Sequence, residues 1–198
     1  MAFKRCPKCE LNYIKEEDEM CDVCANKQGT LNSKPEIKHK GRNIFMVYQG
    51  KSYQQEIAQG YLRAPYQDAG GHDPAHWAML ENVEPGDIIF HVVSQEISAI
   101  SVATSKCFSG RNAGAACRQV NCKPTPLTHK LSTRPYVQDI INTCANLPYQ
   151  PFDRNGDGRQ GYLFDLNDNL AEIFTRAIIS KNPTLLTVIP ELKDIENL

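Results

Sequence analysis

Four cysteines near the start of the chain are spaced as ligands of one metal ion. Two Cys-x-x-Cys pairs, Cys6–Cys9 and Cys21–Cys24, are separated by eleven residues. Paired motifs of this kind can present four thiolates in a tetrahedron, which suits Zn²⁺ at about 2.3 Å per sulfur. All four donors are thiolates, which leaves no open position for a catalytic water, so the pattern predicts a structural zinc ribbon. A segment this short buries little apolar surface, and metal binding would supply its folding free energy.

Other motifs that could do chemistry are incomplete. Asp153, Asn155 and Asp157 begin a loop of the D-x-N-x-D-G calcium type, but its twelfth position is Phe164, where a bidentate glutamate is required. We therefore expect a turn there and no calcium. The sequence contains no G-x-S-x-G, H-E-x-x-H, Walker or deaminase signature. We expect a protein without enzymatic activity.

Charge is distributed unevenly along a chain whose net charge is only -1. Residues 97–138 contain six basic and no acidic side chains, whereas residues 54–96 contain one basic and seven acidic ones. A basic span can present a positive face to phosphate groups, although a solvated surface with interspersed charges is the alternative. The side chains expected to contact phosphate, including two from the basic segment 27–42, are Lys38, Lys40, Lys106, Arg111, Arg118 and Lys123.

Flat aromatic and amide side chains gather in the first part of the main domain. They are Tyr48, Gln49, Tyr53, Tyr61 and Trp77, the last being the only tryptophan. Such side chains can stack on an extruded nucleobase and read its edge. Core packing is the alternative for two or three of them.

A buried hairpin is the element expected to position these residues. Ile88–Val93 and Ile97–Ala103 are continuously apolar runs joined by Ser94–Glu96, which is typical of a strand pair buried on both faces. Pro85, Gly86 and Asp87 before it predict a turn, because they favour the required backbone angles and local hydrogen bonds.

Other elements are weaker or shorter. We expect strands at 43–49 and 115–122, a short helix that Ser52 caps and Gly60 ends, and amphipathic helices at 135–147 and 168–180. The loop 67–77 lacks periodicity and is a candidate lid or binding loop.

The predicted fold class is α+β, with a small twisted, barrel-like sheet flanked by helices and preceded by the zinc ribbon. The expected boundaries are 1–26 for the ribbon, 27–42 for a linker and 43–198 for the main domain. No run approaches the roughly 18 apolar residues of a membrane span, and the N-terminus lacks an apolar signal region. We expect a cytoplasmic protein.

Several short motifs of the main domain, taken together and in order, carry a resemblance. They are Gln49–Tyr53, Gly60–Pro65, His76–Trp77, Val83–His91, Ile97–Ile100 and Gln160–Phe164. This series resembles the EVE branch of the PUA-like superfamily, which is related to YTH domains and occurs as the recognition module of modification-dependent restriction proteins. The resemblance implies an aromatic pocket for a flipped, modified base. Its residues would be Tyr48, Gln49, Tyr53, Tyr61, Arg63, Pro65, His76, Trp77 and His91, with Arg63 standing where many relatives have a pocket tryptophan.

The function expected from these patterns is a non-catalytic reader that binds DNA carrying a modified base, as part of a restriction or defence system. A separate nuclease or NTPase would then act as its effector. Two alternatives remain open at this point. One is an RNA-binding module of the PUA or YTH kind, and the other is an adaptor in which the zinc ribbon docks a protein partner.

Overall fold

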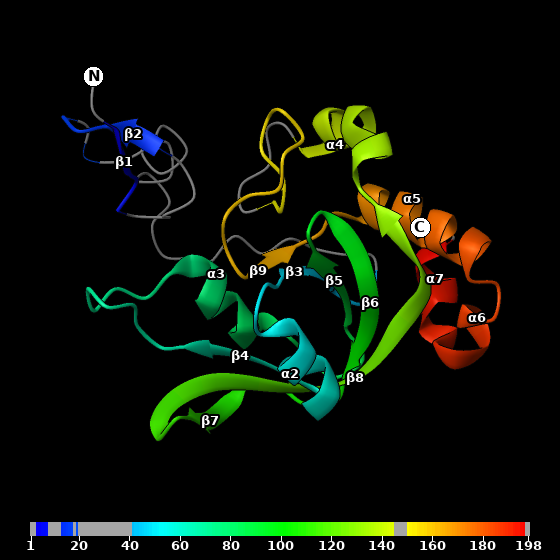
Figure 1. The fold of residues 1–198 in the computed structure, drawn as a ribbon, viewed down its shortest axis with the longest axis horizontal. Coiled ribbons are helices and arrows are strands. Elements are labelled where there is room, and N and C mark those ends of the chain that lie inside the picture. Colours follow the sequence, from blue (N-terminus) through cyan, green and yellow to red (C-terminus); the bar gives the residue numbers. More distant parts are fainter. Residues whose placement is uncertain (1–2, 8–12, 18, 20–40, 145–149, 197–198) are drawn as a thin grey trace.

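A curled sheet of seven strands, with helices on both of its faces, forms the centre of the protein (Figure 1). The structure is a computed structural model that describes residues 3–7, 13–17, 19, 41–144 and 150–196. Its strands run in the order β4-β8-β6-β5-β3-β9, and β7 pairs with β8. They are β3 (Ile44–Tyr48), β4 (Tyr61–Pro65), β5 (Ile88–Val93), β6 (Glu96–Ala103), β7 (Phe108–Asn112), β8 (Ala115–Ser132) and β9 (Leu163–Asp165).

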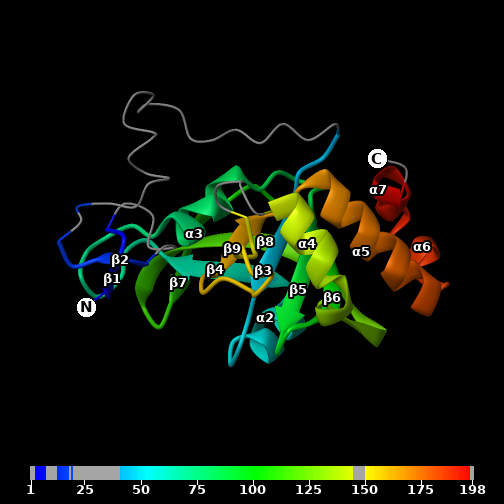
Figure 2. The same cartoon turned by 90° about the horizontal axis from the view of Figure 1, so that it is seen from above.

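Short helices connect and cover these strands (Figure 2). Before β5 in the chain they are α2 (Tyr53–Gln59), α3 (Ala75–Ala78) and η2 (Met79–Asn82). Later in the chain come η3 (Arg134–Tyr136), α4 (Val137–Cys144), α5 (Asp168–Lys181), α6 (Leu185–Val188), η4 (Pro190–Leu192) and α7 (Lys193–Glu196). None of the helices in the described part of the chain is long and apolar enough to cross a membrane.

The central hairpin is confirmed. Strands β5 and β6 pair antiparallel, and nearly all of their residues are buried. Its turn is tighter than expected, because Ser94 and Gln95 alone form the connection, both with positive φ. The turn before it is also confirmed: the Asp87 carboxylate accepts hydrogen bonds from the backbone N–H groups of Glu84 at 2.8 Å and Asn43 at 3.0 Å.

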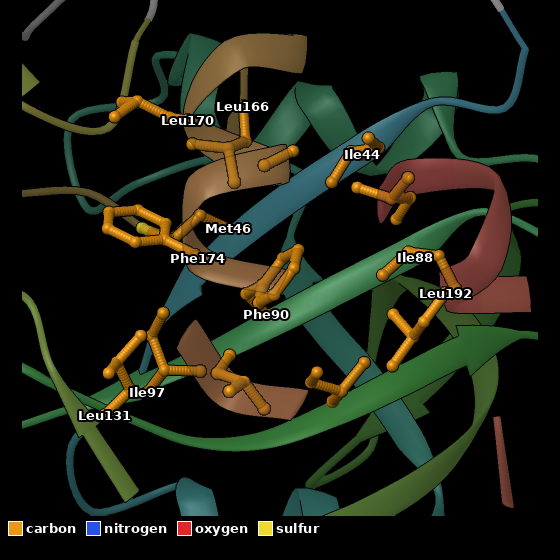
Figure 3. Packing of buried hydrophobic residues seen from close by; sticks show 14 of the residues in the cluster. Ile44, Met46, Ile88, Phe90, Ile97, Leu131, Leu166, Leu170, Phe174 and Leu192 are labelled. Carbon is orange, nitrogen blue, oxygen red and sulfur yellow. The ribbon is translucent and has the colours of Figure 1, made fainter. Parts of the chain in front are cut away.

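Alternating side chains of the buried strands build two cores, one on each face of the sheet. On β3, Ile44 and Met46 face one way and Phe45 and Val47 the other, as the period of two of a strand requires. The larger core packs the first face against α5 and the C-terminal helices (Figure 3). The smaller one packs the second face against η2 and the half-buried Trp77. Burial on both faces explains why β3 and β5 read as continuous apolar runs.

Several boundaries differ from the predicted ones. The strand expected at 115–122 continues to Ser132, pairing first with β4 and β7 and then with β6, and its curvature gives the sheet its half-barrel form (Figure 1). The helix expected at 135–147 is α4, preceded by the 3-10 turn η3; residues 145–149 lie outside the described part. Ser52 makes no capping hydrogen bond from its side chain, but Gly60 does end α2, with φ of 67°.

The N-terminal segment contains a two-stranded antiparallel hairpin of β1 (Phe3–Arg5) and β2 (Tyr13–Lys15). Cys6 follows β1 directly and is fully buried. Cys9, Cys21, Cys24, Lys38 and Lys40 lie outside the described residues. The zinc ribbon and the linker therefore stay predictions.

Candidate nucleic-acid site

A buried polar network begins where β3 ends. The imidazole of His91 is fully buried, with its Nδ1 2.8 Å from the Gln49 Oε1 and its Nε2 2.7 Å from the Ser101 Oγ. Since the Gln49 oxygen can only accept, Nδ1 carries the proton and Nε2 accepts from the serine. Burial lowers the pKa of His91 to about 3, so the ring is neutral. His91 was predicted to line an open pocket, and its burial corrects this: it supports Gln49 from within the core.

The network continues from Gln49 to Glu56 and Tyr162, which were not among the predicted site residues. The Gln49 amide donates to the Glu56 carboxyl, as does the Tyr162 hydroxyl at 2.9 Å. Glu56 is only 4% exposed, and burial raises its pKa to about 7 in spite of those hydrogen bonds and the charge of Arg63. Tyr162 lies within the motif 160–164, but Glu56 had no local signal beyond its place in a short helix.

Tyr162 joins this network to two other groups of predicted site residues. Its hydroxyl accepts a hydrogen bond from the Arg63 backbone N–H at 3.0 Å, and its own backbone N–H donates to the His76 Nδ1 at 3.1 Å. Burial raises the pKa of the Tyr162 hydroxyl well above its usual value, so the hydroxyl keeps its proton. One tyrosine therefore connects β4, α3 and α2.

Tyr48, His76 and Trp77 belong to a continuous row of rings. The centroid distances along the row are 5.6 Å for Trp77–His76, 6.4 Å for His76–Phe164 and 5.7 Å for Phe164–Tyr48. Burial, with a smaller contribution from the charge of Arg5, lowers the pKa of His76 to about 4, so this ring is also neutral. The row is a rigid, half-buried wall, because aromatic pairs in edge and stacked geometries add to the energy of burial.

Arg63 and Tyr61 form a stack at the other end of Tyr162. The Arg63 Cζ lies 4.1 Å from the centroid of the Tyr61 ring, a cation–π distance, and Tyr61 is 6% exposed. The guanidinium is held in place by the Gln119 Oε1, at 3.0 Å from Nη2, and more loosely by the Asn112 Oδ1, at 3.4 Å from Nη1. Pro65 is exposed at the end of the same strand.

Gly110 makes room for this arrangement. A Cβ at this position would lie 2.6 Å from the Gln119 Oε1, the atom that holds Arg63. Sequence reasoning missed both Gln119 and Gly110, because they come from β8 and β7 and meet Arg63 only across the sheet. Tyr53, the first residue of α2, is half-buried, and burial raises the pKa of its hydroxyl.

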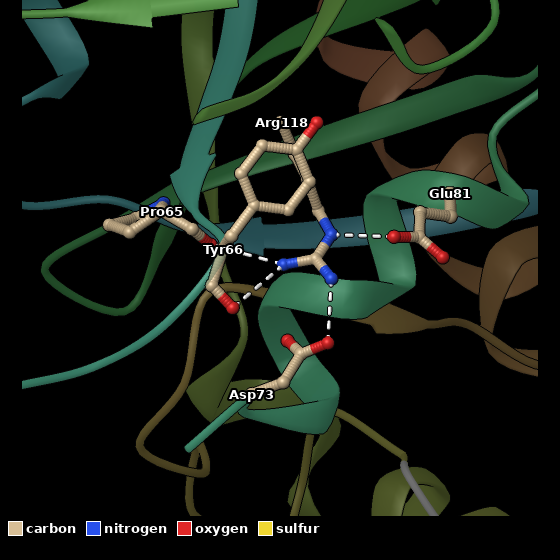
Figure 4. Close-up of polar contacts among 5 residues, drawn as sticks. All are labelled: Pro65, Tyr66, Asp73, Glu81 and Arg118. Carbon is tan, nitrogen blue, oxygen red and sulfur yellow. Dashed lines mark hydrogen bonds and ion pairs between the residues drawn. The ribbon is translucent and has the colours of Figure 1, made fainter. Parts of the chain in front are cut away.

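Arg118 is not placed to contact phosphate, which corrects the prediction (Figure 4). Its side chain is 4% exposed and its guanidinium pairs with Asp73 at 2.6 Å and Glu81 at 2.8 Å. It also donates to the carbonyl oxygens of Pro65 and Tyr66 and lies 4.7 Å from the Tyr66 ring centroid. Arg118 thereby fixes both ends of the loop that was predicted as a lid. It also contacts residues on both sides of α3 in the chain, because Asp73 precedes that helix and Glu81 follows it.

The remaining basic residues differ in their availability. Lys106 pairs with both carboxylate oxygens of Glu84 at 2.8 Å on the surface. Arg111 and Lys123 are exposed, and neither forms an ion pair with another described residue. Within the described ranges, no three His, Cys, Asp or Glu side chains converge as a metal site.

Comparisons with known proteins add little to this picture. No family model matches the chain, and no curated protein matches it. Among solved structures, the chain is similar to the NMR structure of Rpa0253 from Rhodopseudomonas palustris, with 16% sequence identity and a TM-score of 0.34. That match covers 46% of this chain and 68% of the other. A similarity at this level carries no argument about fold or function.

Proposed function

We propose that this protein is a non-catalytic reader that binds DNA carrying a modified base, after the base has been extruded from the helix. The observation that carries the proposal is the Arg63–Tyr61 stack, held by Gln119 and tied through Tyr162 to Glu56. An extruded base needs a flat, rigid surface and donors at its edge. A guanidinium plane that already lies on a tyrosine provides both.

The stack is rigid because its supports are half-buried or buried and bonded to one another. The Arg63 backbone bonds to Tyr162, whose hydroxyl is fixed by Glu56, and Glu56 is fixed in turn by Gln49. Extruding a base costs a few kcal/mol, and stacking contributes roughly 1–3 kcal/mol per base. A preformed site can offset that cost, since little side-chain entropy is left to lose on binding. Trp77, packed in the same core as Tyr162, would bound the site on the side of α3.

The remaining parts of the proposal follow the resemblance to EVE domains and the cysteine spacing. A structural Zn²⁺ held by Cys6, Cys9, Cys21 and Cys24 would fold the N-terminal segment, and exposed Arg111 and Lys123 would attract the phosphate backbone. The reader would act with a separate nuclease or NTPase effector.

A binding titration tests the proposal. Short duplexes with one central 5-methylcytosine or N6-methyladenine, and the unmodified duplex, are titrated with the protein at physiological ionic strength. We expect tighter binding of one modified duplex, and loss of this preference in Arg63→Ala and Trp77→Ala. The control Val188→Ala truncates an apolar side chain that is 50% exposed on α6 and should keep the preference.

Equal affinity of the wild-type protein for all these duplexes would refute modified-base recognition. Competition with RNA of the same sequence separates DNA from RNA reading, because an RNA reader would release the DNA at equimolar competitor. An adaptor would bind neither nucleic acid after loading with zinc.

A further inference from the structure

A surface hollow of about 440 Å³ lies on the face of the sheet to which Arg118 points, opposite the face of the Arg63 stack. It is lined by Tyr66, Glu81, Glu84, Lys106, Cys107, Phe108 and Ser109. We propose that this hollow binds the unpaired base of a nucleotide that neighbours the recognised one, and so gives the protein a preference for sequence context. The inference rests on the proposed function for its biological role, but its chemistry can be tested without it.

The lining has flat apolar surfaces of the kind that a base needs. Tyr66 and Phe108 contribute aromatic rings, and Phe108 is 41% exposed although it is large and apolar. Cys107 between them is half-buried, and burial raises the pKa of its thiol, so it adds a neutral surface. Base–aromatic stacking is tolerant of the base's identity, so these side chains would provide affinity and the polar side chains would provide selectivity.

One wall of the hollow is rigid. Arg118 lies under Tyr66 at 4.7 Å from the ring centroid and pairs with Glu81 at 2.8 Å (Figure 4). Because Arg118 is 4% exposed and also bound to Asp73, it holds the ring and the carboxylate in fixed positions. The buried arginine therefore acts as a positioning residue for two lining side chains.

On the other wall of the hollow, the side chains of Glu84 and Lys106 can exchange their ion pair for contacts with a ligand. Glu84 and Lys106 form an ion pair at 2.8 Å, with side chains that are 49% and 72% exposed. An exposed pair of this kind contributes roughly 0–1 kcal/mol, so a ligand can replace it at little cost. Glu84 would then accept hydrogen bonds from the amino group of a base, while Lys106 would turn towards a phosphate.

The existing ion pairs of the two carboxylates favour a neutral base over a cationic ligand. Two aromatic rings and two carboxylates would also suit a basic peptide side chain. However, each of these carboxylates already has a cationic partner, since Glu81 pairs with Arg118 and Glu84 pairs with Lys106. What remains is a set of acceptors between aromatic surfaces, which fits a base whose edge carries N–H donors.

The hollow lies near Arg63 but on the opposite face of the sheet, because Arg118 and Gln119 are adjacent on β8 and point to opposite faces. A bound strand would therefore pass around β7, which pairs with β8 alone among the described strands. Phe108 is paired with Gln119 across β7 and β8, and Gln119 is paired with Arg63 across β8 and β4. Two strand spacings of about 4.8 Å place the Cα atoms of Phe108 and Arg63 about 10 Å apart. The three strands, counted over residues 61–65, 108–112 and 115–123, contain no acidic side chain that would repel the connecting phosphates.

Free nucleotides test the hollow directly. Wild-type protein labelled with ¹⁵N is titrated with GMP, CMP and UMP while the backbone amide shifts are followed. We expect GMP and CMP, which carry exocyclic amino groups, to shift the amides of Cys107, Phe108 and Ser109, and UMP to bind at least fivefold more weakly. Phe108→Ala should weaken GMP binding roughly fivefold to a hundredfold, the range that loss of one stacking contact gives.

Glu84→Gln isolates the selectivity. This variant should bind GMP, CMP and UMP with affinities that differ by less than twofold, because the neutral amide oxygen accepts more weakly than the carboxylate and the amide NH2 group can donate to a carbonyl of UMP. Glu191→Gln in η4 is the matched control and should keep the wild-type order. Shifts confined to residues around Arg63, or a Phe108→Ala variant with wild-type affinity, would overturn the proposal. Displacement of GMP by a short polyarginine peptide at lower concentration would show a peptide site instead.

The two proposals fail separately. A protein that prefers modified duplexes but shows no nucleotide shifts at Phe108 is a reader without this second site. A protein that binds GMP at Phe108 but does not distinguish modified from plain DNA has the hollow but not the proposed function.

Discussion

Replacement of Arg118 by methionine should destabilise the protein through the loss of two ion pairs. Met fills the space of the aliphatic stem but leaves Asp73 and Glu81 without the guanidinium they contact at 2.6 and 2.8 Å. Breaking a fully buried pair costs about 3–5 kcal/mol. Since the two carboxylates are 47% and 41% exposed and can recover hydration, we expect a smaller loss, of about 2–3 kcal/mol.

Urea denaturation followed by the fluorescence of Trp77, the only tryptophan, measures this loss. For a chain of this size, about 2–3 kcal/mol corresponds to a fall of about 4–12 °C in Tm. Hydrogen exchange should increase in the loop before α3, because Arg118 also holds the Pro65 and Tyr66 carbonyl oxygens at 3.2 and 3.3 Å. Arg111→Met is the matched control, since Arg111 is exposed on neighbouring β7, and it should change the unfolding free energy by less than about 0.5 kcal/mol.

Equal unfolding free energies of the Arg118→Met and Arg111→Met variants would contradict this prediction. The four contacts of Arg118, with Asp73, Glu81 and the Pro65 and Tyr66 carbonyl oxygens, would then add no net stability. The salt dependence of DNA binding provides a second check. A phosphate contact contributes about 0.9 to the slope of log K against log salt for a duplex, whereas a buried clamp contributes none. A wild-type slope is expected for Arg118→Met, and a lowered slope would restore the role that the sequence predicted.

Three further predictions concern the site and the metal. The pKa of Glu56 is about 7 in the folded protein, above its value in the unfolded chain, so protonation of this carboxyl favours folding. The stability that protonation contributes is lost as the pH rises through about 7. Glu56→Gln, which mimics the protonated acid, should gain stability relative to wild type between pH 5 and 8, and a constant difference in urea midpoints over this range would contradict the buried acid. Gly110→Ala should displace Gln119 and lower the affinity for DNA several-fold. Gly50→Ala is the control and should leave the affinity unchanged, because a Cβ there meets nothing within 4 Å. Equal titration curves for the two variants would show that Gly110 is not needed to position Gln119. Metal analysis should find one Zn²⁺ per chain, which is lost in Cys6→Ser but kept in Cys107→Ser. A wild-type protein whose N-terminal segment folds equally well without zinc would argue against the ribbon.

Local sequence patterns were sufficient to predict the strands and helices that have a strong hydrophobic pattern. The hairpin of β5 and β6 and the helix α5 were predicted closely, because continuous apolar runs and a stripe at helical spacing both report burial directly. Strand β4 and the second half of β8 were missed. Tyr61–Pro65 is short, and β8 contains Pro124 and Pro126, which argue against a strand unless it bends or bulges. The register of β6 against β8 shifts between Ile97 and Ala99, so Pro126, opposite Ala99, lies next to an irregularity, whereas Pro124 lies in the regular register opposite Ser101.

The roles of individual charged and polar residues were harder to predict. His91 and Arg118 were assigned to a pocket and to a phosphate-binding face, yet both are buried. Their burial depends on Gln49 and Ser101 in one case and on Asp73 and Glu81 in the other, partners that are distant in the sequence. A basic run in the sequence says nothing about which of its members meets a carboxylate in three dimensions.

From the sequence alone, the spacing of Cys6, Cys9, Cys21 and Cys24, the buried hairpin and the α+β class could be deduced, because each depends on residues close together in the chain. Only the tertiary structure places Gln119 and Gly110 beside the Arg63–Tyr61 stack and connects it through Tyr162 to Glu56, a buried acid whose pKa is raised to about 7. These contacts join five separate segments of the chain. The contacts between strands depend on strand order and register, and a one-residue shift in register would move the side chains of the shifted strand to the opposite face of the sheet.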